Sequence, residues 1–158
     1  PTYRGWQKLP DNALGHAVFS AAMSIRVPYF ASVLPRVTKL EPGLCEVRSP
    51  KWWGVHNHLG TFHAIAACNL AEVAMGMLSE ATVPNSHRWI PKSMKVDYLA
   101  KAETGLRAVA QNTTARPETR AGGAVSEMSR DQDDWRRLGS RFIGRQTLPA
   151  YGLAQAGR

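Results

Sequence analysis

Cysteine is scarce in this chain, whose 158 residues include only Cys45 and Cys68. No secretory signal sequence precedes these two residues, so we expect reduced thiols in the core of a cytoplasmic protein and not a disulfide-stapled secreted domain. The chain also lacks a strong internal repeat. Its length fits one domain, which we expect at residues 1–145.

Acidic residues are few as well, 12 against 20 lysines and arginines, which gives a formal net charge of +8. This imbalance indicates an anionic partner, and the charge alone is consistent with nucleic acid or with a phosphate-bearing small molecule. The basic residues are dispersed, however, and no nucleic-acid-binding motif accompanies them. We therefore expect no nucleic acid partner.

Charge is nearly missing from one long apolar segment, because Glu72 is the only charged side chain between Thr61 and Ser79. The segment reaches the length of a membrane span, but its polar residues and many alanines favour an interior helix, so we expect no membrane span. A lone carboxylate in such a helix is costly to bury unless it is paired or protonated. Burial raises the pKa of a carboxyl group, which would suit Glu72 to act as a general base near neutral pH.

Hydrophobic periodicity and turn signals predict an α+β domain in which an antiparallel sheet wraps around one long central helix. That helix is expected from Thr61 or His63 to about Glu80, enclosed on nearly all sides. An N-terminal helix is expected at about 12–26, capped by Asp11. The strands expected before the C-terminal segment are 33–41, 44–48, 90–99 and 106–110.

The C-terminal segment has a different composition, since every basic residue after Gln111 is arginine and the apolar alternation fades. Two further strands are predicted there, at 124–128 and 138–143, and residues 146–158 are expected to form a mobile tail. A reading-frame change in this part of the gene is one hypothesis for the break.

The start of the central helix can bind an oxyanion, because the backbone N–H groups around His63 and Ala64 have no partner within the helix. Glu72 follows His63 by nine residues, or roughly 13 Å along the helix axis. Both groups of one chain therefore cannot touch the same ligand atom. The ligand either lies along the helix or is completed by a second subunit.

A particular order of polar and small residues runs through this region: Asn57, Gly60, Thr61, His63 and Ala64, then Leu70, Ala71 and Glu72. It resembles the signature of hotdog-fold acyl-CoA thioesterases, in the branch whose helix reads N-H-x-G-T-x-H-A…N-L-A-E. The segment from Met94 to Leu99, with Ala102 and Gly105, resembles the strand that follows in that branch. The likeness covers about residues 28–110 and implies a hotdog fold.

The resemblance implies roles for four residues. Glu72 falls where the family has its catalytic Asp or Glu, which acts as general base on water or as nucleophile on the thioester carbonyl. Ala64 falls where many members have a glycine whose N–H polarises that carbonyl, and His63 helps to shape the pocket. Asn57 matches an asparagine that positions the thioester or the attacking water.

The resemblance also implies an acyl-CoA substrate, no separate cofactor, and a homodimer or tetramer whose active site lies between two subunits. Arg88, Lys92 and Lys95 are the candidates for contact with the phosphates of coenzyme A. Some relatives hold the water with a hydroxyl residue on the next strand. The equivalent position here is near Pro91, with Ser93 as an approximate substitute.

Plainer interpretations stay open for each of these residues. Glu72 can be a structural residue bonded to a neighbour, His63 a hydrogen-bonded pocket histidine, and Asn57 a cap of the turn before the helix. The lysines can be solvated strand residues. A metal site is a further alternative, and its ligands would come from His56, His58 and His63 with Cys68 or Glu72.

Two functions from different classes follow. The first is hydrolysis of acyl-CoA to a free acid and coenzyme A. The second is a non-catalytic hotdog protein that binds an acyl-CoA or serves in assembly, and a metal hydrolase ranks third. The sequence leaves the acyl specificity open.

Overall fold

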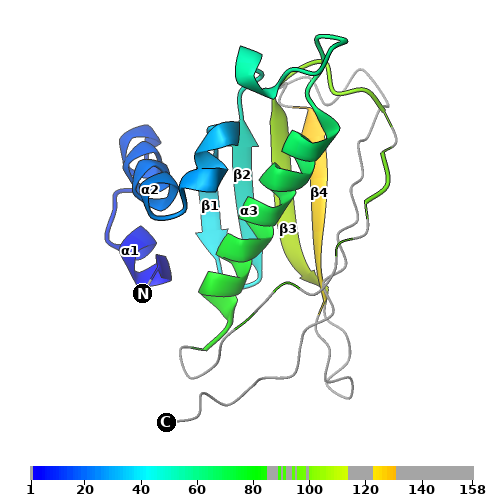
Figure 1. The fold of residues 1–158 in the computed structure, drawn as a ribbon. Helices are drawn as coiled ribbons and strands as arrows, with labels where there is room; N and C mark the ends of the chain where they lie inside the picture. The colour runs from blue at the N-terminus through cyan, green and yellow to red at the C-terminus, as the bar shows by residue number, and fades with distance from the viewer. Residues whose placement is uncertain are drawn as a thin grey trace.

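A four-stranded antiparallel sheet and one long helix form the centre of the molecule (Figure 1). The computed structural model describes residues 2–84, 89, 91, 94, 96–98, 100–113 and 123–130. The strands lie in the order β1-β2-β3-β4, and α3 crosses one face of the sheet. The strand bounds are β1 Arg36–Glu41, β2 Leu44–Ser49, β3 Leu106–Thr113 and β4 Gly123–Arg130.

The central helix α3 spans Ala64–Thr82, close to the predicted range. It ends before Pro84 because the residue before a proline is excluded from the helical region, and Val83 accordingly has an extended backbone. By length and composition α3 could cross a bilayer, but 56% of the apolar window is buried inside the molecule. The prediction that it is enclosed on nearly all sides is wrong at its start, because Ala64 and Ile65 are exposed, whereas Asn69–Ala71 and Val73–Leu78 are buried.

Two helices precede the sheet, α1 at Thr2–Gln7 and α2 at Ala13–Arg26, and they lie beside β1 and α3 (Figure 1). The sequence predicted α2 but not α1. It also predicted Asp11 as the N-cap of α2, and the structure places Asn12 there, with Oδ1 accepting from the N–H groups of Leu14 and Gly15. Asn12 takes this role because its extended backbone aims Oδ1 at the first turn.

The strand predicted at 33–41 starts later, at Arg36. Residues Pro28–Val33 form a 3-10 helix, η1, and Leu34 has a left-handed backbone at φ 44°. A left-handed residue followed by a proline cannot continue a strand ladder, so pairing begins only after Pro35. The hairpin turn before β2 forms as predicted, with Gly43 at φ +88°.

The strand predicted at 106–110 is confirmed by β3, and the one at 124–128 by β4. The strand predicted at 90–99 is wrong for the residues described there, which have no regular secondary structure. A strand requires backbone hydrogen bonds to a neighbour, and none of the four described strands pairs with this segment. The predicted strand at 138–143 and the predicted tail at 146–158 lie outside the described residues.

The core lies between α3 and the facing side of the sheet. Cys45 and Val47 of β2 point toward it and are fully buried, as are Leu70 and Val73 of α3. Both cysteines are free thiols, but only Cys45 is in the core. Burial, followed by the neighbouring charge of Glu46, raises the pKa of the Cys45 thiol, which therefore stays protonated at neutral pH.

Candidate active site

The loop between the short 3-10 helix η2 (Trp53–Val55) and α3 is organised by the side chain of Asn57. Its Oδ1 accepts hydrogen bonds from the N–H groups of Leu59 and Thr61, both at 3.0 Å, and its Nδ2 donates to Thr61 Oγ1 at 2.8 Å. Gly60 lets the loop turn back, with φ at +70°. The structure thus places Asn57 in the turn-capping arrangement. Its implied role toward a thioester or a water molecule stays a prediction.

The start of α3 leaves the backbone N–H of Ala64 free among the described residues. His63 is the N-cap, and its Nδ1 accepts from Ile65 N–H at 3.1 Å. The N–H of Ala64 has no hydrogen-bond partner in the described part of the chain, and the residue is exposed. First-turn N–H groups also carry the positive end of the helix dipole. Ala64 can therefore donate a hydrogen bond to an anionic oxygen.

Glu72 lies eight residues after Ala64 on the same helix, about 12 Å along its axis. The prediction that it is buried is wrong: Glu72 is only half-buried, because it faces a cavity, although the residues on both sides of it in the chain are buried. Its carboxylate makes no hydrogen bond or ion pair with the other described residues. It lines a cavity of about 940 Å³ between α2 and α3. An unbonded carboxylate at a cavity is free to bind a ligand or a water molecule.

Cys68 lies on the same side of α3 as Ala64 and Glu72, although no catalytic role was predicted for it. Ala64, Cys68 and Glu72 recur every four residues, and this spacing puts them on one face of a helix. Cys68 Sγ lies 3.0 Å from Tyr98 Oη. That hydrogen bond, with smaller contributions from burial and from the charge of Cys68, raises the pKa of Tyr98 to about 12. Tyr98 is therefore a neutral hydroxyl at neutral pH beside this face.

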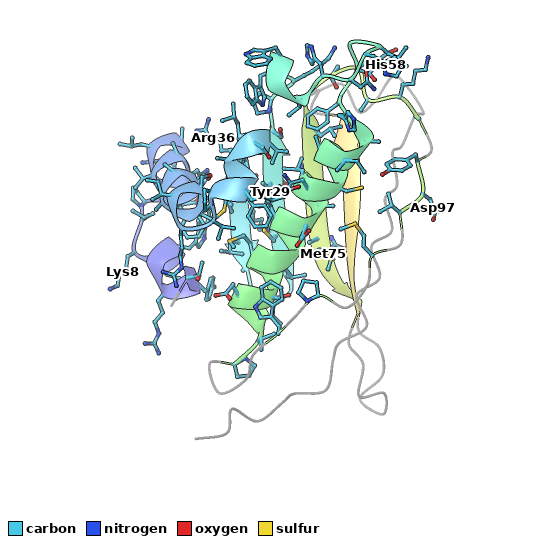
Figure 2. The ribbon with its side chains drawn as sticks, viewed as in Figure 1. Lys8, Tyr29, Arg36, His58, Met75 and Asp97 are labelled. Atoms are coloured by element: carbon cyan, nitrogen blue, oxygen red, sulfur yellow. The ribbon has the colours of Figure 1, made fainter. Side chains whose placement is uncertain are left out.

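The residues proposed as metal ligands do not come together. No group of three His, Cys, Asp or Glu side chains is close enough to hold a metal ion within the described ranges. Figure 2 shows His58 in the loop before α3, away from Met75, which lies near the middle of that helix and three residues after Glu72.

The basic residues implied for coenzyme A, Arg88, Lys92 and Lys95, lie outside the described residues, and so does Ser93.

Solved structures of other proteins resemble this fold. The probable thioesterase PA5026 from Pseudomonas aeruginosa superposes with a TM-score of 0.65 at 20% identity, covering 81% of this chain and 91% of that one. A thioesterase family protein from Silicibacter pomeroyi gives 0.63 at 20% identity, covering 83% and 91%. The fold is the hotdog fold, as the resemblance of the sequence implied.

A family model makes the assignment more specific. Residues 15–134 match the domain of unknown function DUF4442, and the chain belongs to that family. The structural-genomics protein APC5556 is 36% identical, with 98% of this chain and 97% of that chain covered and a TM-score of 0.76. No curated protein is significantly similar in sequence.

Proposed function

We propose that this protein is a thioesterase that hydrolyses acyl-CoA thioesters to a free acid and coenzyme A. The observation that carries the proposal is the pairing of two unoccupied groups on α3: the Ala64 N–H at its start and the Glu72 carboxylate at a cavity. The thioesterase names of the structural neighbours support the reaction class.

In this mechanism Glu72 accepts a proton from a water molecule, and the water oxygen attacks the thioester carbonyl carbon. The negative charge that develops on the carbonyl oxygen is stabilised by the N–H of Ala64 and the positive end of the α3 dipole. Collapse of the tetrahedral intermediate breaks the C–S bond. The proton held by Glu72 returns to the coenzyme A thiolate, and the acid is released.

The distance between the two groups supports a site that is shared by two copies of the chain. A carbonyl carbon and its oxygen are separated by one bond, whereas Ala64 and Glu72 of one α3 are about 12 Å apart along the axis. We therefore infer a homodimer, or a tetramer built from such dimers, in which Ala64 of one copy faces Glu72 of the other. His63 orients the helix start by capping it.

Asn57 takes part in the same proposal through its spacing from Glu72. In two structures of the thioesterase SAV0944 from Staphylococcus aureus, a glutamine and a glutamate are each replaced by alanine, and these are separated by the same fifteen positions as Asn57 and Glu72. An amide side chain at this place can donate to the substrate through the Nδ2 hydrogen that Thr61 does not use.

Thiol release from a panel of acyl-CoAs tests the proposal, with wild type compared with Glu72→Gln. The amide cannot accept the proton of water, so we expect a loss of roughly 10²–10⁴-fold in kcat. Glu41→Gln is the matched control, because Glu41 is an exposed residue of the distant β1–β2 turn. If wild type releases no thiol from any chain length and still binds acyl-CoA, the non-catalytic alternative replaces the enzyme.

A further inference from the structure

The cavity beside Glu72 has walls that fit a hydrocarbon chain. They come from α1, α2, η1, α3 and the segment after α3, and most of the described lining side chains are apolar: Leu9, Val18, Phe19, Ala22, Met23, Val27, Phe30, Met77, Val83, Pro84 and Trp89. The volume of about 940 Å³ is at the upper end of the usual range for small-molecule sites. Apolar walls of this extent favour an apolar ligand over water.

The charges on the described lining indicate which part of an acyl-CoA enters. The lining contains two carboxylates, Glu72 and Glu80, and one guanidinium, Arg26. A net negative lining repels the phosphates of coenzyme A, whereas an uncharged acyl chain is not affected by it. The cavity is therefore suited to the acyl end of the substrate.

We propose that this cavity holds the acyl chain and that the substrates are medium- to long-chain fatty acyl thioesters, an inference that rests on the proposed function. The thioester carbonyl lies at Glu72, and the chain runs along α3 toward its C-terminal end. The lining extends from Glu72 to Val83 along the chain, which is about 16 Å of helix. An acetyl or propionyl group leaves most of this length empty.

Trp89 covers part of the cavity beyond Glu72, beside Gly76 and Glu80 of α3. Its indole ring packs over Gly76, where an added Cβ would lie 3.3 Å from Trp89 Cη2, and its Nε1 donates to Glu80 Oε1 at 3.2 Å. A glycine inside a helix costs about 1 kcal/mol relative to alanine. Gly76 is explained by the room it leaves for this ring, and we expect Trp89 to limit the space available to the acyl chain beyond Gly76.

The test compares tryptophan substitutions at two neighbouring positions of α2. Ala22 lines the cavity and Ala21 does not, and both are exposed. We expect Ala22→Trp to fill the cavity and to lower kcat/KM for palmitoyl-CoA at least tenfold, with less than a threefold change for acetyl-CoA. Ala21→Trp is expected to match wild type on both substrates. An equal loss on both substrates, or no loss with Ala22→Trp, would overturn the assignment.

A binding measurement separates this inference from the proposed reaction. Titration of palmitic acid into each variant by calorimetry is expected to show binding to wild type and to Ala21→Trp, and at least tenfold weaker binding to Ala22→Trp. This pattern of palmitic acid binding, in a protein that releases no thiol, supports the cavity as the acyl site and rejects the thioesterase reaction. If the wild type releases thiol but Ala22→Trp binds palmitic acid as tightly as the wild type, the thioesterase reaction is supported and the cavity is rejected as the acyl site.

A second variant covers the case in which Ala22→Trp fails to fold. Trp89→Leu removes the indole ring that covers the cavity beside Gly76, and it is expected to shift the preferred substrate to longer acyl chains by at least two carbons. A chain-length profile identical to that of wild type would contradict the assignment.

Discussion

Glu46 of β2 has the most extensive ionic contacts of any described carboxylate, and it lies on the sheet face away from α3. Its carboxylate accepts from Arg107 Nη2 at 2.5 Å, from Thr38 Oγ1 at 2.8 Å and from Arg48 Nε at 3.3 Å. Burial raises the pKa of Glu46, but the hydrogen bonds from Arg107 and Thr38, the charge of Arg107 and the bond from Arg48 outweigh it. The pKa therefore lies below its usual value.

At the residue scale this predicts acid sensitivity. A lowered pKa stabilises the fold above the unfolded-state pKa of about 4.3, and the contribution is lost as the pH falls below that value. We expect Glu46→Gln to lower the free energy of unfolding by about 1–2 kcal/mol at pH 7, and the difference from wild type to shrink at pH 3. Urea unfolding at the two pH values measures this.

The control for that prediction is Glu41→Gln. Among the described residues, Glu41 pairs with Lys39 at 3.1 Å, and both side chains are about half exposed. Exposed pairs of this kind contribute little, so we expect a change under about 1 kcal/mol at pH 7. A difference for Glu46→Gln that is the same at both pH values would show that it acts through packing and not through charge.

At the scale of elements, α2 depends on a cap that sequence alone did not identify correctly. Asp11 and Asn12 are adjacent, and both residue types are good N-caps. The choice depends on the backbone: Asn12 is extended at φ −148°, and its Oδ1 reaches two first-turn N–H groups. Asp11 instead pairs with His16 Nε2 at 2.8 Å and is 93% exposed.

The two residues therefore differ in their contribution to stability. We expect Asn12→Ala to lower the free energy of unfolding by about 1 kcal/mol, the usual cost of losing an N-cap. Asp11→Ala is expected to cost less than half as much, since its carboxylate is exposed. Chemical denaturation of both variants at neutral pH tests the assignment, and a larger effect at Asp11 would reverse it.

At the scale of the whole molecule, the proposed site depends on two copies. Ala64→Pro removes the proposed oxyanion donor with little expected harm to α3, because proline is well tolerated at the first position of a helix. His63 already has φ −65° and ψ 134°, a conformation that is favourable before a proline. Ala64→Gly keeps the N–H and is expected to exceed Ala64→Pro in activity at least tenfold.

Complementation then tests whether the site lies between subunits. Ala64→Pro and Glu72→Gln are each expected to be inactive alone. A hybrid dimer of the two, purified through different tags after co-expression, has one site with both groups intact, so it should recover about half of the wild-type kcat. An inactive hybrid would place both groups of each site in one chain.

Much of the fold could be predicted from local sequence. The apolar run ending before Pro84 gave the central helix, and the turn at Gly43 gave the β1–β2 hairpin. The errors occurred where local pattern competes with the surroundings. Leu34 and Pro35 shorten the predicted strand, and the segment predicted as a strand at 90–99 has a suitable alternation but no pairing partner among the described strands.

The candidate site, like the fold, could be predicted from the sequence only in part. Residue types and spacing were enough to single out Glu72, Ala64 and His63, because a free helix start and a lone acid are visible in the order of residues. Asn57 was added by the resemblance to hotdog-fold thioesterases. The surroundings of these groups were not visible. How far Glu72 is buried depends on the cavity that it lines together with α1, α2 and Trp89, which are brought there by the packing of distant parts of the chain.

By itself, then, the sequence determined an α+β domain built on one long helix and the order of chemical groups along that helix, since both follow from local periodicity and chain geometry. The hotdog fold was implied by the resemblance to hotdog-fold thioesterases. Only the tertiary structure decided that Glu72 is half-buried beside an apolar cavity and that Ala64 keeps a free N–H. The physical reason is that exposure and cavity shape depend on side chains from several elements at once, and no single stretch of sequence contains them.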